Sequence, residues 1–244
     1  MSTLPQCEIV AHIHCAFGSK FGIPRQSGLV EEIEGKIVFT PKYRQAEALR
    51  GIEGFSHLWL LWHFSENDRA GKAPSLTVRP PRLGGNTRLG VFATRSPFRP
   101  TPIGLSSVEL VRIEYDTPEG PVLYIKGADL AHMTPILDIK PYLPFTDAHP
   151  DAKTGFTEQT YAYSLAVSIP EQIASTLSPE DRSAITALLA EDPRPAYHQD
   201  AERVYGFTYA GKEIRFRVED ATAIVVSIDE QMRSKQKNCR IKKA

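Results

Sequence analysis

Residues 79–104 read RPPRLGGNTRLGVFATRSPFRPTPIG, a stretch whose prolines and glycines limit the backbone that it can form. Five prolines stand at positions 80, 81, 97, 100 and 102. Each removes a backbone donor and fixes φ, so a mainly helical segment is excluded. Gly-Gly-Asn at 84–86 predicts a tight turn, and 88–94 reads as one strand that leads into an ordered loop. The prolines also stiffen this loop, so its side chains would lose less freedom on binding a ligand.

The same stretch is strongly basic. From 69 to 108 the chain contains no Asp or Glu. The seven positive side chains of this window are Arg69, Lys72, Arg79, Arg82, Arg88, Arg95 and Arg99. A solvated loop normally mixes charges of both signs, so we interpret the window as an anion-binding surface. The alternative is a structural arginine-rich loop.

The composition is that of a soluble protein. The chain has 244 residues, of which 41% are apolar and 24% charged, enough for one large domain or two with a proper core. The formal net charge is zero, so only local clusters of charge point to nucleic acid. Cys7, Cys15 and Cys239 lack metal-type spacing and fit a reducing compartment. No signal-peptide pattern opens the chain, and the longest apolar run (58–62) is too short to span a bilayer. We expect a cytoplasmic protein.

On both sides of the arginine stretch the sequence reads as short strands separated by Pro/Gly turns. Strands are expected at 8–15, 36–39, 55–64, 106–115 and 122–127, a pattern typical of a closed, barrel-like sheet. After a polar stretch at 146–160, a strand at 161–169, a helix capped by Ser178 and strands at 205–209, 213–218 and 223–228 are expected. The predicted fold class is therefore mainly β (α+β). It consists of an N-terminal β-barrel domain (1–150) without a Rossmann fold and a small α+β C-terminal domain (151–244).

Two further polar groups stand out. The turn-rich loop 17–28 presents Arg25 and Gln26, although it also fits an ordinary surface turn. If 136–140 is extended, Asp138 and Lys140 share one face next to Tyr142, as a functional pair or as a structural salt bridge.

The histidines and the common catalytic motifs give no metal or cofactor site. His57 and His63 share a strand face without a third ligand, so we interpret them as core or rim residues. The sequence has no GxGxxG after a strand, P-loop, HExxH or GxSxG motif. From spacing alone, no reaction can be named.

Several phrases resemble the TrmO (TsaA-like) family of tRNA methyltransferases, and they extend over nearly the whole chain. They are FGIPRQSGLV (21–30), GIEGFSHLWLLWHF (51–64), VRPPRLGGNTRLGVFATRSPFRPTPIGLSSVEL (78–110), DIKPYLPF (138–145) and DPRPAY (192–197). The resemblance implies methyl transfer from S-adenosylmethionine to N6 of threonylcarbamoyladenosine at tRNA position 37. It also implies a non-Rossmann β-barrel, a small C-terminal domain and a homodimer, with no metal.

The resemblance further implies a cofactor site. Its expected residues are Pro24, Arg25, Gln26, Ser65, Glu66, Arg95, Ile103, Asp129, Leu130, Thr134 and Pro135. Arg95 would hold the cofactor carboxylate bidentately or fix the backbone, while Asp129, Thr134 and the backbone around Leu130 would bind adenine or ribose. Many relatives read DGTP where this chain has His132-Met133-Thr134-Pro135, so the cofactor loop departs from the family pattern here.

Roles for the acceptor follow from the same resemblance. Asp138 would orient the N6 amine by accepting its hydrogen bond, with Lys140 and Tyr142 holding the geometry. The residues expected to meet RNA are Arg79, Arg82, Arg88, Arg99, Arg194, Tyr197, Arg215 and Arg217. Two alternatives remain: a sensor that binds S-adenosylmethionine without transferring its methyl group, and an RNA-binding module without a cofactor.

Overall fold

The computed structural model describes residues 7–18, 20–65, 75–83, 86–159, 163–194, 200 and 202–230. Within these ranges a closed antiparallel barrel has the strand order β1-β2-β7-β6-β3-β8. Its strands are β1 (Ala11–Cys15), β2 (Glu34–Phe39), β3 (His57–His63), β6 (Ile103–Glu114), β7 (Val122–Lys126) and β8 (Pro135–Pro141). The barrel expected from the turn-separated strands is confirmed.

Alternation along β3 fills the barrel. Leu58, Leu60 and Trp62 are buried inside, whereas His57 and Trp59 face outward. Trp62 lies against Gly104 on β6, where a Cβ would come within 2.2 Å of the indole ring. This glycine is therefore required for the tryptophan to close that end of the barrel.

The arginine stretch forms short elements around the barrel. β4 (Thr77–Val78) pairs with β5 (Leu89–Gly90), and Val91–Ala93 is a 3-10 helix. The prediction of one strand over 88–94 was wrong beyond Gly90, because the Thr94 amide and hydroxyl both donate to the Val91 carbonyl and close a turn. Other short helices before β9 are Pro41–Tyr43, Ala46–Leu49, Ile52–Gly54, Pro81–Leu83, α1 (Pro144–Asp147) and Gly155–Gln159.

The C-terminal domain is a sheet covered by one main helix. Its strand order is β10-β11-β12-β9, with β9 parallel to β12. The elements are β9 (Ala166–Ser168), α2 (Glu171–Ala174), α3 (Pro179–Ala190), β10 (Tyr205–Tyr209), β11 (Lys212–Glu219) and β12 (Thr222–Glu230). As predicted, Ser178 caps α3, accepting a hydrogen bond from the Asp181 amide at 3.0 Å.

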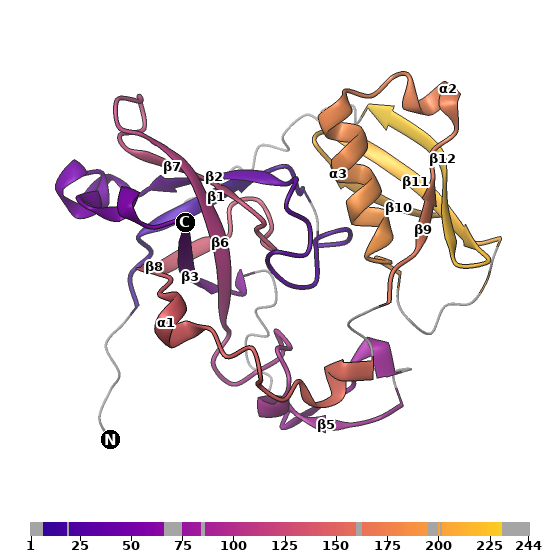
Figure 1. Ribbon diagram of the computed structural model, residues 1–244, viewed down its shortest axis with the longest axis horizontal. Coiled ribbons are helices and arrows are strands. Elements are labelled where there is room, and N and C mark those ends of the chain that lie inside the picture. Colours follow the sequence, from indigo (N-terminus) through magenta and orange to yellow (C-terminus); the bar gives the residue numbers. More distant parts are fainter. Residues whose placement is uncertain are drawn as a thin grey trace, which may run out of the picture.

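The loop that follows β1 connects the two domains, which lie side by side with the segment around β5 beneath them (Figure 1). Phe17, Val30 and Ile33 belong to the hydrophobic core of the C-terminal domain. Gly22 (φ 92°) also approaches that domain, since a Cβ here would come within 2.5 Å of the Phe207 ring. The expected domain boundary near residue 150 stays a prediction.

Across the described ranges, no helix combines the length and the apolar character needed to span a membrane.

Candidate functional site

A cavity of about 720 Å³ lies against the barrel wall formed by β3 and β6. Its floor includes Ile103, Leu105 and Ser107 of β6. One side, the polar wall, consists of Pro24, Arg25, Gln26, Ser27, Arg95 and Asp129. The opposite side, the aromatic wall, consists of His57, Trp59, Tyr142 and Asp147.

Strand β6 separates the two walls. Ser107 is the register partner of Trp59 on β3, but its amide donates to the Ser27 hydroxyl at 3.2 Å. In an antiparallel pair such an amide points away from the register partner. The aromatic wall and the loop that carries Ser27 therefore lie on opposite sides of the same strand.

The four consecutive residues 25–28 each form a hydrogen bond with a different part of the molecule. Arg25 donates to the backbone carbonyl of Asp192 in the C-terminal domain at 2.5 Å. The amide oxygen of Gln26 accepts a hydrogen bond from Arg95 in the arginine stretch. Ser27 binds β6, and the Gly28 amide donates to the Gly127 carbonyl at 2.9 Å. This loop is consequently held between both domains.

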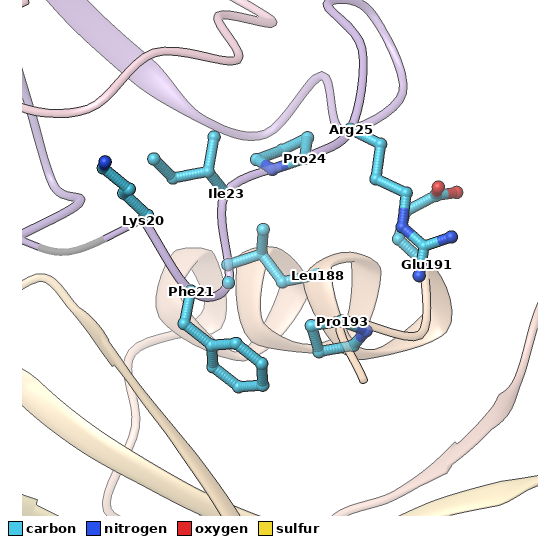
Figure 2. Close-up of a pocket in the computed structure, with 9 residues that line it drawn as sticks. Lys20, Phe21, Ile23, Pro24, Arg25, Leu188, Glu191 and Pro193 are labelled. Atoms are coloured by element: carbon cyan, nitrogen blue, oxygen red, sulfur yellow. The ribbon is translucent and has the colours of Figure 1, made fainter. Parts of the chain in front are cut away.

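Pro24 and Arg25 also line a second, smaller cavity of about 120 Å³ at the end of α3. Figure 2 shows Arg25 extending beside Glu191, with Leu188 and Pro193 on the helix side of this cavity. Two of the expected cofactor residues, Pro24 and Arg25, thus lie directly against the C-terminal domain.

Asp129 is the buried carboxylate of the polar wall. The Ser106 hydroxyl donates to it at 2.5 Å and accepts a hydrogen bond from the Trp62 indole nitrogen at 2.9 Å. Burial raises the pKa of Asp129 above its usual value, although the Ser106 hydrogen bond and the charge of Arg95 oppose the shift. The polar wall therefore combines the cationic side chain of Arg95 with the carboxylate of Asp129, whose burial is only partly offset by its hydrogen bonds and by the charge of Arg95.

Asp147 fixes the aromatic wall. Its carboxylate accepts hydrogen bonds from the Trp59 indole nitrogen at 2.8 Å and from the Leu143 amide at 2.9 Å. These bonds, with that of the Leu143 amide the larger influence, lower the pKa of Asp147, so it stays ionised at neutral pH. The rings of Trp59 and Tyr142 lie 5.4 Å apart at 49°, and His57 lies 6.2 Å from Tyr142.

The expected cofactor residues divide into two groups. Those that line the cavity are Pro24, Arg25, Gln26, Arg95, Ile103 and Asp129. The others are Ser65, Leu130, Thr134 and Pro135, together with Glu66, which lies outside the described residues. Leu130 is buried in the barrel core, Thr134 is buried, and Pro135 begins β8. The cofactor role of all eleven stays a prediction.

The departure at His132-Met133 has a visible structural consequence. Met133 has φ 65°, in the left-handed region that favours glycine. His132 packs against His14 at 5.2 Å, and its Nδ1 accepts a hydrogen bond from the Cys15 amide at 3.3 Å.

Of the expected catalytic trio, only Tyr142 lines the cavity. Asp138 and Lys140 share one face of β8, as predicted, and form an ion pair of 2.8 Å with side chains 48% and 60% exposed. They are the register partners of Leu61 and Trp59. Their part in the reaction stays a prediction.

The arginines expected to bind RNA have different surroundings. Arg99 lines the cavity and donates to the Thr94 carbonyl at 3.0 Å, while Arg79 and Arg88 are exposed. Arg194 donates two hydrogen bonds to the carboxylate of Asp192, and its side chain is only 12% exposed. Arg215 and Arg217 pair with Glu213 and Glu219 at 3.1 and 3.5 Å. Tyr197 and the side chain of Arg82 lie outside the described residues.

Sequence reasoning missed several residues that line the cavity: Ser27, Trp59, Leu105, Ser107 and Asp147. His57 was expected at the core or rim, and it is exposed on the aromatic wall. Period-two alternation placed His57 and Trp59 on one face, which was the signal available for this wall. No such signal existed for Asp147, which stands in the polar stretch at 146–160. Among the described residues, no group of three His, Cys, Asp or Glu side chains could hold a metal ion.

Comparison with known proteins gives consistent matches along the chain. The family model of the tRNA-methyltransferase O N-terminal domain matches residues 12–148, and that of the TrmO C-terminal domain matches residues 162–231. The chain is 42% identical to the tRNA (adenine(37)-N6)-methyltransferase of Escherichia coli K12 over 92% of this chain and 97% of that protein. It is 47% identical to the protein of that name from Eikenella corrodens over 71% of this chain and 97% of the relative.

Solved structures agree with the sequence matches. The crystal structure of TrmO from P. aeruginosa superposes with a TM-score of 0.75 at 31% identity, covering 94% of this chain and 99% of the other. The fold is thus shared over almost the full length of both chains. The chain belongs to the TrmO family.

Proposed function

We propose that this protein is an S-adenosylmethionine-dependent methyltransferase that methylates N6 of adenine 37 in tRNA. The curated relatives carry that activity in their names. The observation that carries the proposal is the cavity itself, whose polar and aromatic walls face each other across β6. More finely, we propose that the substrate adenine already bears a threonylcarbamoyl group, and that the product is its N6-methylated form.

The polar wall fits the chemical groups of the cofactor. S-adenosylmethionine carries a carboxylate, an ammonium group, a sulfonium and an adenosine. Arg95 is exposed, lines the cavity and offers a guanidinium suited to a carboxylate. Asp129 offers a negative charge, and Gln26 lies next to Arg95. When bound there, the cofactor would supply the methyl group as an electrophile on sulfur.

The residues of this chain would act mainly by alignment. Methyl transfer is an in-line displacement, so holding the acceptor nitrogen in line with the methyl group gives much of the acceleration. Asp138, held by its ion pair with Lys140, remains our candidate for orienting N6, and its side chain would have to turn toward the cavity, which it does not line here. The N6 proton leaves as the new carbon–nitrogen bond forms, and a nearby carboxylate or water accepts it.

The threonylcarbamoyl group adds a carboxylate to the substrate, which calls for a cation. Arg25, Arg95 and Arg99 line the cavity. Arg25 is engaged by the C-terminal domain, and Arg95 is assigned to the cofactor. We therefore assign the threonylcarbamoyl carboxylate to Arg99.

A homodimer and a cytoplasmic location complete the proposal. Large apolar side chains that are strongly exposed, namely Leu76, Phe92 and Phe145, are compatible with a second copy covering part of the surface. Light scattering after size-exclusion chromatography would give the mass in solution, and a monomeric mass would remove this part.

A methyl-transfer assay tests the function. Purified protein and labelled S-adenosylmethionine are incubated with tRNA that carries threonylcarbamoyladenosine at position 37 and with tRNA that lacks it. Label at this nucleotide only in the modified pool is the expected result. Equal label in both pools would remove the requirement for the threonylcarbamoyl group. Cofactor binding without label in either pool would favour a sensor, and tRNA binding without cofactor binding would favour an RNA-binding module.

A further inference from the structure

We propose that the aromatic wall is the subsite for the acceptor base, where a purine turned out of single-stranded RNA stacks on the Trp59 indole beside Tyr142, whose ring contacts those of both Trp59 and His57. This inference rests on the proposed function and deepens it, because it divides the cavity between cofactor and substrate. The polar wall holds the cofactor, and the aromatic wall holds the nucleobase that receives the methyl group.

The first support is the fixed position of the Trp59 ring. Its indole nitrogen donates to Asp147, whose carboxylate is held in turn by the Leu143 amide at the start of α1. Tyr142 is tied to β3 through its amide, which donates to the His57 carbonyl at 3.0 Å. An aromatic surface that is already ordered loses little freedom when a base stacks on it. Base–aromatic stacking is the common way in which proteins hold unpaired bases.

The second support is the separation of charge between the two walls. The guanidinium of Arg95 and the carboxylate of Asp129, which suit the charged groups of the cofactor, lie on the polar wall. On the aromatic wall the carboxylate of Asp147 is already used by two hydrogen bonds within the protein. The aromatic wall therefore offers mainly ring faces, with one carboxylate that is held by hydrogen bonds within the protein, which suits a neutral base.

The third support is the distance across the floor. The walls lie on the two sides of β6, so about two strand spacings, roughly 10 Å, separate them. The floor between them carries Ile103 and Leu105, residues that are 37% and 54% exposed. Two ligands could thus lie side by side over an apolar surface. A cavity of about 720 Å³ has room for both.

The test compares two RNA hairpins with the sequence of an anticodon stem-loop, one with the threonylcarbamoyl-modified adenosine of the proposed function at position 37 (the adenosine hairpin) and one with an abasic site there. Affinities of the full-length protein are measured by fluorescence polarisation, and S-adenosylmethionine affinity is measured separately by calorimetry. For Trp59→Leu we expect affinity for the adenosine hairpin to fall about 10-fold or more, as for the loss of one stacked base. Affinities for the abasic hairpin and for S-adenosylmethionine should stay within a factor of about 2.

Two further variants make the test specific. Trp59→Phe keeps a ring face and should retain most of the preference for adenosine. Tyr115→Leu removes an exposed aromatic side chain just beyond β6, away from the cavity lining, and should change nothing. If Trp59→Leu does not fold, Tyr142→Leu takes its place, with the loss of preference for adenosine as the criterion.

Three outcomes would overturn the proposal. Weaker S-adenosylmethionine binding with the preference for adenosine intact would assign the aromatic wall to the cofactor. An equal loss for both hairpins would mean that Trp59 supports the RNA backbone and not the base. An unchanged preference for adenosine in a folded Trp59→Leu protein would exclude stacking. Failure of the proposed function is recognised separately, as the absence of methyl transfer by the unaltered protein.

Discussion

Two proline-stiffened arginine segments of this protein have similar sequences but different surroundings. In residues 192–194 of the C-terminal domain, Arg194 donates two hydrogen bonds to Asp192 at 2.8 and 3.0 Å, and the side chains of Asp192 and Arg194 are only 9% and 12% exposed. In the arginine stretch (residues 79–104), Arg79, Arg88 and Arg95 are exposed. Arg99 is half-buried, and none of these four arginines forms an ion pair within the described parts of the chain.

The nearest acid in the sequence explains why these arginines differ in role. Asp192 stands two residues before Arg194 and neutralises it inside the protein, where it also accepts a hydrogen bond from Tyr163 at 3.1 Å. No acid occurs from 69 to 108, so the arginines there keep their charge for an anion from outside. One segment holds the fold, and the other is available for a ligand.

The largest expected effect comes from breaking the buried pair. Asp192→Ala leaves the guanidinium of Arg194 without its carboxylate partner, which should lower the free energy of unfolding by about 3 kcal/mol. For a chain of this size, such a loss corresponds to a melting temperature lower by roughly 6–12 °C. Differential scanning calorimetry measures it. Arg88→Ala is the control from the arginine stretch, and a comparable loss of stability there would erase the distinction between the two segments.

The same pair predicts a pH dependence. Burial raises the pKa of Asp192, but hydrogen bonds from Arg194 and Tyr163 and the positive charge of Arg194 outweigh it, so the pKa lies below its usual value. A carboxyl group with a lowered folded-state pKa stabilises the protein above its unfolded-state pKa of about 3.9 and loses this contribution as the pH falls through the folded-state value. The stability advantage of the unaltered protein over Asp192→Asn should therefore be constant above about pH 5 and shrink below about pH 4. An advantage that grows on acidification would contradict this sign.

The next largest effect is expected for Arg95, in the arginine stretch. Arg95→Ala should weaken S-adenosylmethionine binding by about 10- to 100-fold, the usual cost of a lost hydrogen bond to a charged group. The melting temperature without the cofactor should hardly change, because Arg95 is exposed. Calorimetric titration gives the affinity, with Arg95→Lys as a variant that keeps the charge but not the bidentate geometry. Unchanged affinity in Arg95→Ala would return this arginine to a structural role.

Much of the fold followed from the sequence, and less of the site did. The alternation of apolar and polar residues predicted the strands of the barrel, and the Ser178 cap predicted the main helix of the C-terminal domain. Both signals lie in residues that are close together in the sequence. The 3-10 turn at Val91–Ala93 was missed because it is closed by Thr94 and not by a glycine or a proline. The place of Arg25 depends on a contact across 167 residues, and that of Asp147 depends on Trp59, 88 residues away. No local sequence pattern predicts contacts between residues so far apart in the chain.

Smaller effects are expected for the exposed arginines of the stretch. If Arg79 and Arg88 meet phosphates of the anticodon loop, each alanine variant should weaken tRNA binding a few-fold. Each should also reduce the slope of log affinity against log salt by about 0.7, the value for one contact to a single strand. Filter binding at several salt concentrations gives this slope. A loss of affinity that leaves the slope unchanged would show that the arginine acts through the shape of the loop and not through its charge.

The smallest effect is expected for Arg215, which lies between the two cases. Its guanidinium pairs with Glu213 at 3.1 Å, as Arg194 pairs with Asp192, but the two side chains are 50% and 41% exposed. An exposed pair contributes little to stability, so Arg215→Ala should hardly change the melting temperature of the protein. If Arg215 binds tRNA, the salt slope should fall as for Arg79, and Glu213→Gln should strengthen binding by freeing the guanidinium. If neither variant changes tRNA affinity, we would conclude that an arginine paired with a neighbouring acid does not bind tRNA, whether the pair is buried or exposed.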